Sequence, residues 1–164
     1  MANLGRLWAP WRARFLSQPK RRRCIFCVAT RSKRDRRHYV VDRGKRVFAL
    51  LNLYPYNNGH LMIAPYRHVG TLERLSVEEW ADMLTLSRRL MQRLKRRLHP
   101  HGFNVGLNLG RTAGAGIPGH LHLHVVPRWN GDTNFLPVLG QTKVISQSLD
   151  ELYRLLTGGR RRAP

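Results

Sequence analysis

The chain has 164 residues, the length of one domain. Hydrophobic residues make up 42% of it, enough for a packed core, and 30 Lys and Arg against 9 Asp and Glu give a formal charge of +21. This charge attracts polyanions such as nucleotides, phosphate or nucleic acid. No apolar run in the sequence is long enough to cross a bilayer, and the first residues do not have the pattern of a signal peptide. We therefore expect a cytoplasmic protein without a membrane partner.

Residues 1–46 form a basic N-terminal segment that contains 15 of the 30 basic residues. The densest runs are residues 20–23 and 31–37, and a third run, residues 160–162, lies in the C-terminal tail. Such runs are typical of a solvated surface, and they also attract an anionic substrate. Nucleic acid is an alternative partner that no recognition motif supports.

The same segment carries Cys24 and Cys27, which two residues separate. Two thiolates at this spacing bind one zinc ion, and a tetrahedral structural site needs two more ligands. The sequence has no further cysteine, so these ligands would be histidines, and the spacing alone does not choose among them. A redox role for the cysteine pair is the alternative.

Two strands with a long turn between them follow the basic segment. Residues 47–51 are an apolar run typical of a buried strand, and residues 54–59 are rich in turn-favouring types. Residues 60–64 read as the returning strand, which Pro65 ends. We expect an antiparallel hairpin.

A long helix is predicted behind a capping box at Ser76, with an apolar stripe from Trp80 to Leu98. Ser76 and Glu79 have the spacing of a capping box, and apolar residues, Leu84 among them, then recur every three or four positions. Pro100 ends the pattern. This apolar stripe is predicted to face the core.

The remaining elements complete an α+β domain. Residues 103–109 alternate as a strand, residues 110–119 are a glycine-rich connection, and residues 121–126 are another strand. A shorter C-terminal helix is predicted over residues 147–156. The order of elements favours an antiparallel sheet with one long helix and this shorter one. The predicted divisions are the basic segment 1–46, a core domain 47–145, and a C-terminal helix and basic tail 146–164.

The strongest chemical signal is the alternation of His120, His122 and His124 with leucines. Alternate residues of a strand share a face, so the three imidazoles point one way and the leucines point into a core. One chemistry for such a face is a metal site made by the three histidines themselves. The other is nucleophilic and acid–base work on a phosphoryl group, in which a neutral imidazole forms a phosphoramidate. The basic charge and the glycine-rich connection favour the second.

Residues 120–126 resemble the signature of the histidine triad (HIT) family, in which histidines alternate with apolar residues. Further blocks are similar to the bacterial branch of this family that includes diadenosine tetraphosphate phosphorylase. These blocks are residues 7–12, 49–55, 59–68, 102–108 and 127–135. The resemblance implies a HIT-like antiparallel sheet, and a homodimer or higher homo-oligomer in which two sheets join.

The resemblance also implies the catalytic residues. His122 would be the nucleophile that attacks the α-phosphorus and forms a nucleotidyl-histidine intermediate. His124 would contact the phosphates and assist the leaving group. Asn52 would bond the ribose hydroxyls, and Asn108 would lie on the phosphate side.

One departure from the family concerns the phosphate contacts. Many family hydrolases carry a hydroxyl residue shortly before the triad, and residues 116–119 of this chain have none. Thr112, or the backbone amides of Gly114 and Gly116, would then hold the phosphates.

In zinc-bearing members of the family, the ligands are a cysteine pair, a histidine after the second strand of the hairpin, and the first histidine of the triad. The resemblance therefore implies a structural zinc ion. Its ligands would be Cys24, Cys27, His68 and His120.

Together these features predict an enzyme, a nucleotidyl transferase or hydrolase. The expected substrate is a nucleotide or dinucleoside polyphosphate, diadenosine tetraphosphate above all, with phosphate or water as the acceptor. One alternative is a broad-specificity nucleotide hydrolase or phosphoramidase. The other is a zinc-stabilised protein that binds nucleotides or nucleic acid and has no catalytic role.

Overall fold

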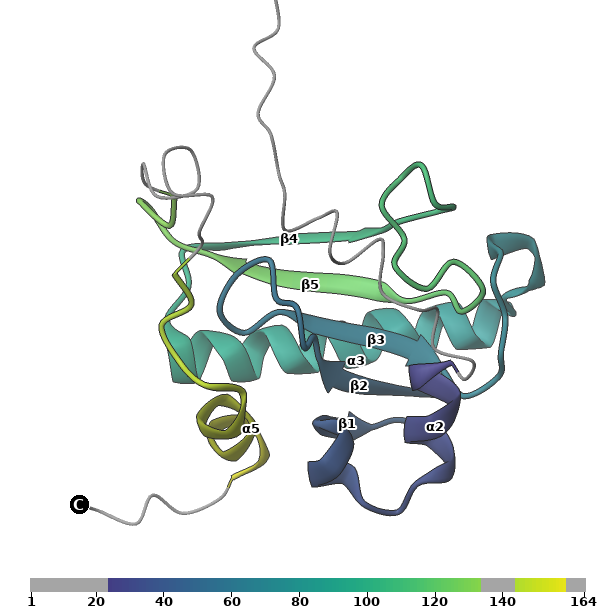
Figure 1. Ribbon diagram of the computed structural model, residues 1–164, viewed down its shortest axis with the longest axis horizontal. Coiled ribbons are helices and arrows are strands. Elements are labelled where there is room, and N and C mark those ends of the chain that lie inside the picture. Colours follow the sequence, from purple (N-terminus) through teal and green to yellow (C-terminus); the bar gives the residue numbers. More distant parts are fainter. Residues whose placement is uncertain (1–23, 134–143, 159–164) are drawn as a thin grey trace, which may run out of the picture.

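The computed structural model describes residues 24–133 and 144–158. Its centre is one sheet in the strand order β1-β2-β3-β5-β4, in which each neighbouring pair is antiparallel (Figure 1). The predicted α+β class is thereby confirmed. The sequence block at residues 7–12 and the basic runs at 20–23 and 160–162 lie outside the described residues. The strands are β1 (Val40–Arg43), β2 (Val47–Leu51), β3 (Leu61–Pro65), β4 (Gly102–Leu107) and β5 (Leu123–Arg128).

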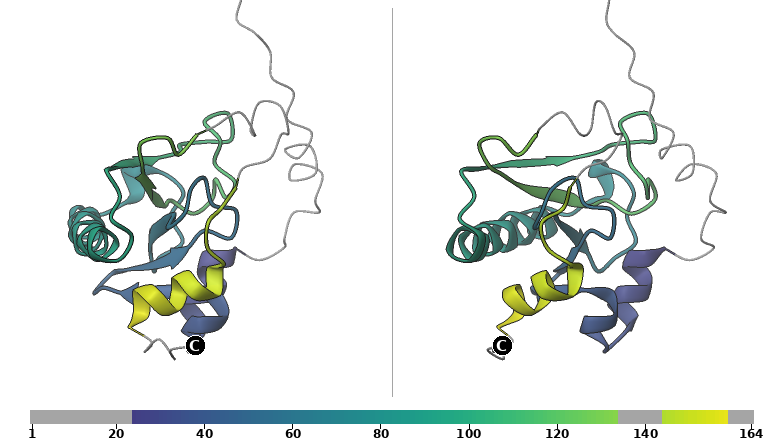
Figure 2. Two further views of the ribbon diagram at one scale, coloured as in Figure 1. Left: turned by 90° about the vertical axis from the view of Figure 1, so that its left-hand side faces the viewer. Right: turned by 60° about the vertical axis from the view of Figure 1, so that its left-hand side comes forward.

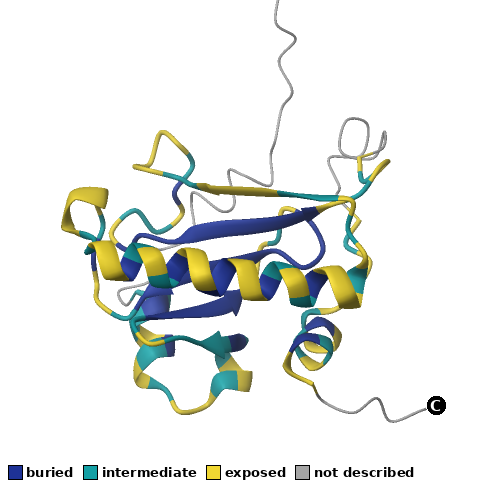
Figure 3. Cartoon of the chain, turned by 180° about the vertical axis from the view of Figure 1, so that it is seen from behind, coloured by how far each residue is buried: buried dark blue, intermediate teal, exposed yellow. Residues whose placement is uncertain are grey.

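The long helix α3, Val77–Leu98, covers one face of the sheet (Figure 1). The predicted capping box is confirmed, because the Ser76 hydroxyl accepts from the Glu79 amide and the Glu79 carboxylate accepts from the Ser76 amide. The expectation for Leu84 is wrong, since this side chain is 47% exposed. It follows Met83 and therefore lies about 100° around the helix from the buried stripe. Figure 3 shows that stripe in dark blue, and its apolar members are Met83, Leu86, Leu90 and Leu94.

The predicted C-terminal helix is α5, Leu149–Thr157. It lies near α3 on the same side of the molecule (Figure 2), and it adds Leu152 and Leu156 to the core that α3 forms with the sheet. Ser148 and Glu151 form a second capping box at its start. None of the helices in the described ranges is long and apolar enough to cross a membrane.

In the described residues, the helix α2 (Ile25–Arg31), a 3-10 helix at Asp35–His38 and the strand β1 precede residue 47, where the sheet was predicted to begin. The strand β1 pairs with β2 at one edge, and the helix α2 packs Phe26 and Ala29 against the sheet. Residues 24–46 thus share the sheet and core of the residues that follow. Neither α2 nor β1 was predicted, because α2 has only 7 residues and β1 only 4, too few for an apolar period to be read.

The sheet separates two apolar clusters because successive side chains of a strand point to opposite faces. In β2, Ala49 and Leu51 pack into the larger cluster with α3. Phe48 and Leu50 pack into the smaller cluster with α2. The hairpin of β2 and β3 is confirmed, with Val47 opposite Pro65 and Leu51 opposite Leu61.

The strand that carries the triad begins later than predicted, at Leu123 rather than residue 121. Ahead of it, the Leu121 amide donates to the Val69 carbonyl at 2.7 Å, so the loop after β3 holds this segment in place of a neighbouring strand. The alternation of faces is nevertheless present. Leu121 and Leu123 are buried in the cluster with α3, whereas His124 is opposite Met62 on the face of α2.

The loop between β2 and β3 depends on Gly59. Its φ is +76°, and an added Cβ would lie 2.9 Å from Leu98 Cδ1 and 3.0 Å from Pro127 Cγ. We predict that Gly59→Ala lowers the free energy of unfolding by about 1–3 kcal/mol, because it adds backbone strain and overpacking. Urea denaturation measures this loss. Gly102→Ala is the control, since a Cβ there meets nothing within 4 Å; an equal effect of both changes would contradict the prediction.

Candidate active site and metal cluster

Four side chains from separate parts of the chain meet beside the start of β5. Cys24 and Cys27 come from the start of α2, His68 from the loop after β3, and His120 from the segment before β5. Their ligand atoms all lie within 4.8 Å of one another. The structure therefore brings together the four residues of the expected metal site, and this cluster could hold a metal ion.

The distances inside the cluster suit a small tetrahedral ion. Cys24 Sγ lies 3.4 Å from His120 Nδ1, Cys27 Sγ lies 3.2 Å from His68 Nδ1, and the two Nδ1 atoms lie 3.2 Å apart. Ligands at the usual Zn–S and Zn–N bond lengths of a tetrahedral site are about 3.3–3.8 Å from one another. Thiolate and imidazole are also the donors that zinc prefers.

His120 is fully buried, and its other nitrogen is already engaged. Nε2 lies 2.9 Å from the carbonyl oxygen of Pro65, to which an N–H must donate. The proton of the neutral ring is therefore on Nε2, and the lone pair on Nδ1 faces the cluster. A carbonyl that fixes the orientation of a ligand in this way is common around metal sites.

His122 has the opposite arrangement. Its Nδ1 lies 2.8 Å from the carbonyl oxygen of His120, so Nδ1 carries the proton and Nε2 keeps a lone pair. The ring is 6% exposed and packs on Phe26, with 4.8 Å between the ring centroids. Burial lowers the pKa of His122 below its ordinary value, which favours the neutral ring.

A second buried histidine, His60, decides which ring nitrogen of His124 carries the proton. The Tyr56 amide donates to Nδ1 of His60 at 3.0 Å, so the ring proton of His60 is on Nε2. This Nε2–H donates to Nδ1 of His124 at 2.9 Å. In the neutral ring of His124 the proton is then on Nε2, and that N–H points away from His60. Two neighbouring imidazoles, those of His122 and His124, thus present a lone pair and an N–H donor respectively.

The structure places the other expected residues at different distances from these rings. The Asn52 side chain touches His60, with Nδ2 3.3 Å from Nδ1, and its Oδ1 accepts from the Tyr54 amide. Asn108 Nδ2 lies 3.4 Å from Nε2 of His124. In the described residues, no hydrogen bond or ring contact joins Thr112, Gly114 or Gly116 to the triad. These three stay predictions.

Two members of the site, His60 and Tyr56, were not predicted as such from the sequence. His60 was read as the start of a strand and as one of several histidines that could be zinc ligands, and Tyr56 as part of a turn. A signal existed for His60, because Met62 is opposite His124 and position 60 therefore lies on the same face of the next strand. The pairing of β3 with β5 was needed to use it. For Tyr56 the sequence carried no comparable signal, since a loop of nine residues has no fixed period.

Comparisons with known proteins agree with this geometry. A family model described as HIT domain matches residues 33–131. The AP-4-A phosphorylase of Mycobacterium tuberculosis is 45% identical over 161 residues, which are 93% of this chain and 83% of that protein. The bis(5'-nucleosyl)-tetraphosphatase (asymmetrical) of Schizosaccharomyces pombe is 33% identical over 93 residues, which are 57% of this chain and 50% of that protein. Among solved structures, a Zn-bound histidine triad family protein from Mycobacterium smegmatis matches with a TM-score of 0.65 and 26% identity, over 82% of this chain and 91% of that one.

The buried pair of His60 and His124 predicts a pH dependence of stability. Desolvation lowers the pKa of His60 from 6.5 to about 3 and that of His124 from 6.5 to about 4. Between these values and about 6.5 the unfolded chain binds protons that the folded chain does not, so stability rises with pH, by up to about 1.4 kcal/mol per pH unit for each group. We expect the free energy of unfolding in urea to fall between pH 6.5 and pH 5.

The variant His60→Asn removes one of the two groups and should reduce this slope by about one proton. His99→Asn is the matched control, because His99 is exposed and Asn tolerates its φ of +49°. An equal slope in the wild type and in His60→Asn would contradict the prediction.

Proposed function

The chain belongs to the histidine triad (HIT) family, and we propose that it is an enzyme that cleaves dinucleoside polyphosphates, diadenosine tetraphosphate above all. The observation that carries this proposal is the arrangement of His122. Its Nδ1–H is bonded to the His120 carbonyl, which leaves the Nε2 lone pair for attack on phosphorus. A protein that only binds nucleotides has no need of this arrangement.

In the first step, Nε2 of His122 attacks the α-phosphorus. The N–P bond forms, the bond from phosphorus to the bridging oxygen breaks, and ATP leaves with the electron pair. The imidazole then carries an AMP group, and its positive charge is stabilised by the hydrogen bond from Nδ1–H to the His120 carbonyl. In the second step an oxygen of the acceptor attacks the phosphorus and releases the neutral His122.

His124 supports both steps as a hydrogen-bond donor. Its Nε2–H, fixed by the contact from His60, can approach an oxygen of the leaving phosphate. Asn52 is at the end of β2, where a ribose would lie, and Asn108 is beside Nε2 of His124. We place the phosphate chain between Asn108 and the loop that contains Thr112, Gly114 and Gly116.

Phosphate is the acceptor that we favour. A phosphorylase activity is the one named for the M. tuberculosis relative, which is similar over most of both chains. With phosphate the products are ADP and ATP, and with water they are AMP and ATP. The S. pombe relative is named a tetraphosphatase, and hydrolysis is therefore the outcome against which phosphorolysis must be tested.

We propose zinc as the ion of the metal cluster and a structural role for it. The donor set of two thiolates and two imidazoles fits zinc, and the M. smegmatis relative in the same family is Zn-bound. When bound, the ion would supply a cross-link and no step of the reaction. It would join α2 to the loop after β3 and to the start of the triad, which keeps Phe26 against His122.

We further propose that the protein is a homodimer whose sheets join along β4. This strand is at an edge of the sheet. Its residues are half-buried or exposed, whereas those of β2 and β3 are buried throughout (Figure 3). Val105, in its middle, is 45% exposed. An edge strand with an exposed apolar side chain is suited to pair with a second copy.

The zinc proposal predicts about one zinc ion per chain in the purified protein, measured by mass spectrometry of the metal content. Cys27→Ser should remove most of this zinc and lower the melting temperature by several degrees, because the cross-link is lost. His38→Asn is a matched control, since His38 is not part of the cluster. A protein without near-stoichiometric zinc, whose melting temperature Cys27→Ser leaves unchanged, would contradict the proposal.

The catalytic proposal is tested by product analysis. The protein is incubated with diadenosine tetraphosphate, with and without inorganic phosphate, and the nucleotides are separated by chromatography. We expect ADP and ATP, formed only when phosphate is present. AMP and ATP in both conditions would indicate a hydrolase instead.

His122→Asn should lower turnover by at least about a thousandfold, because the nucleophile is lost. Its affinity for the substrate, measured by calorimetry, should change little. The control is His99→Asn, at the exposed end of α3. Full activity of His122→Asn would disprove the role of this residue.

A further inference from the structure

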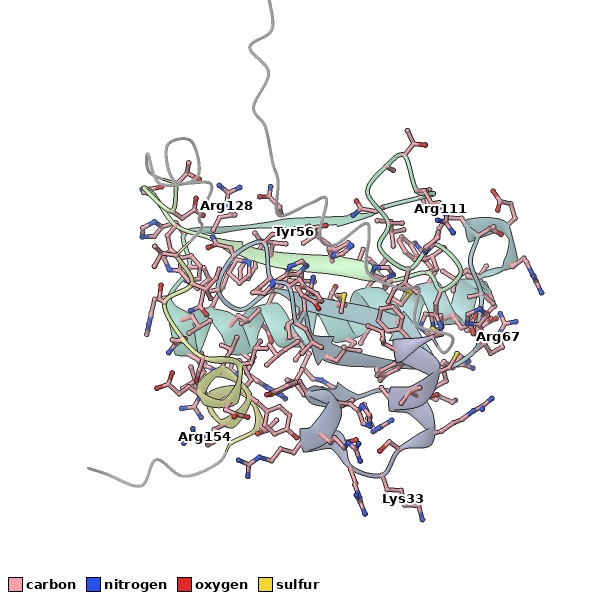
Figure 4. The ribbon with its side chains drawn as sticks, in the orientation of Figure 1. Lys33, Tyr56, Arg67, Arg111, Arg128 and Arg154 are labelled. Carbon is pink, nitrogen blue, oxygen red and sulfur yellow. The ribbon has the colours of Figure 1, made fainter. Side chains whose placement is uncertain are left out.

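The ring of Tyr56 covers the pair of His60 and His124. Its centroid lies 4.6 Å from that of His60 and 5.7 Å from that of His124, and it stacks on His124 at an interplanar angle of 23°. Figure 4 labels Tyr56 next to β4 and β5. The residue is 49% exposed, so the ring lies between the two buried imidazoles and solvent.

The hydroxyl of Tyr56 belongs to a group of polar atoms beside these imidazoles. Nδ2 of Asn108 lies 3.5 Å from the Tyr56 hydroxyl oxygen and 3.4 Å from Nε2 of His124. Nε2 of His124 carries a proton, because Nδ1 accepts from His60. A hydroxyl, an amide and an imidazole N–H are thus gathered around one small region. The Asn108 amide donates to the Tyr56 hydroxyl oxygen, whereas this amide and the N–H of His124 are both donors and do not bond to each other.

This arrangement suits an anionic oxygen. Three groups that can each donate a hydrogen bond are close together, and an oxygen with negative charge would accept shorter, stronger bonds from them. Of residues 110–119, only Thr112 has a hydroxyl, and it is exposed and has no hydrogen bond with the triad. Residues 110–119 thus place no hydroxyl in hydrogen-bond contact with the triad. Tyr56, in the β2–β3 loop, supplies a hydroxyl near His124 instead.

We propose that the hydroxyl of Tyr56 donates a hydrogen bond to the oxygen that leaves the α-phosphorus, together with the Nε2–H of His124. This inference rests on the proposed function. While the bond from phosphorus to oxygen breaks, the electron pair stays on the oxygen of the departing ATP, and the two donors stabilise its growing charge. The phenol keeps its proton.

Such a donor matters most for a leaving group that develops strong negative charge on its oxygen. ATP departs with the charge of a phosphate, whereas the sulfate that leaves adenosine 5'-phosphosulfate is a far weaker base. The two substrates share the adenylyl group that His122 receives. A donor to the leaving oxygen therefore affects the first substrate much more than the second.

The test is Tyr56→Phe, which removes the hydroxyl and keeps the ring on His124. With diadenosine tetraphosphate we expect kcat to fall by about 10- to 100-fold and KM to change less than about threefold, because the bond strengthens mainly in the transition state. With adenosine 5'-phosphosulfate we expect kcat to fall by less than about threefold. Tyr54→Phe is the matched control, an exposed tyrosine of the same loop, and should behave as the wild type with both substrates.

Three results would overturn the proposal. Unchanged kcat of Tyr56→Phe with diadenosine tetraphosphate would show that the hydroxyl makes no contribution. An equal loss with both substrates would show that Tyr56 only positions His124. Wild-type protein that cleaves neither substrate would overturn the proposed function as well, so the two failures are distinguishable.

Discussion

The position of one proton on each buried imidazole is the constraint on which the site depends. The Pro65 carbonyl keeps a proton on Nε2 of His120, and the His120 carbonyl keeps one on Nδ1 of His122. The Tyr56 amide donates to Nδ1 of His60, so the proton of His60 is on Nε2. This N–H donates to Nδ1 of His124. Residues of the same type on one face would otherwise be chemically alike. Because each has a different partner, one imidazole faces the metal cluster, one offers a lone pair and one offers an N–H.

Burial keeps these rings neutral, and the two faces of the sheet supply that burial. Leu121 and Leu123 point into the cluster that α3 covers, so the histidines between and beside them point toward α2. Phe26 of α2 packs on both His120 and His122, at 4.9 and 4.8 Å between centroids. Apolar cover of this kind lowers the pKa of an imidazole and so preserves a nucleophile at neutral pH. The metal cluster lies at the start of the same short helix, where Cys24 and Cys27 meet His120 of the segment before β5.

Local features of the sequence were predicted well, and features that depend on the pairing of strands far apart in the sequence were not. Ser76 and Glu79 act within one turn of helix, and the alternation around the triad acts within one strand, so both could be read directly. The four ligands of the metal cluster came from a resemblance to a family, since no spacing relates residues almost a hundred positions apart. His60 reaches His124 only through the pairing of β3 with β5, and Tyr56 reaches it through the path of a loop. The short α2 and β1 have too few residues to show a period, and the tertiary contacts with the sheet decide their structure.

The second half of the β2–β3 loop, residues 57–60, is held by hydrogen bonds and close packing. Asn57 donates to the Pro127 carbonyl at 3.1 Å and to the Asp132 carboxylate at 2.8 Å, and Arg128 pairs with the same carboxylate. Gly59 fits against α3 with no room for a side chain, and His60 is 1% exposed. The end of the loop that leads into His60 is therefore anchored. Donors that are already in place stabilise developing charge without a cost of rearrangement during the reaction. The same contacts that fold this loop thus orient the groups that we assign to the leaving phosphate.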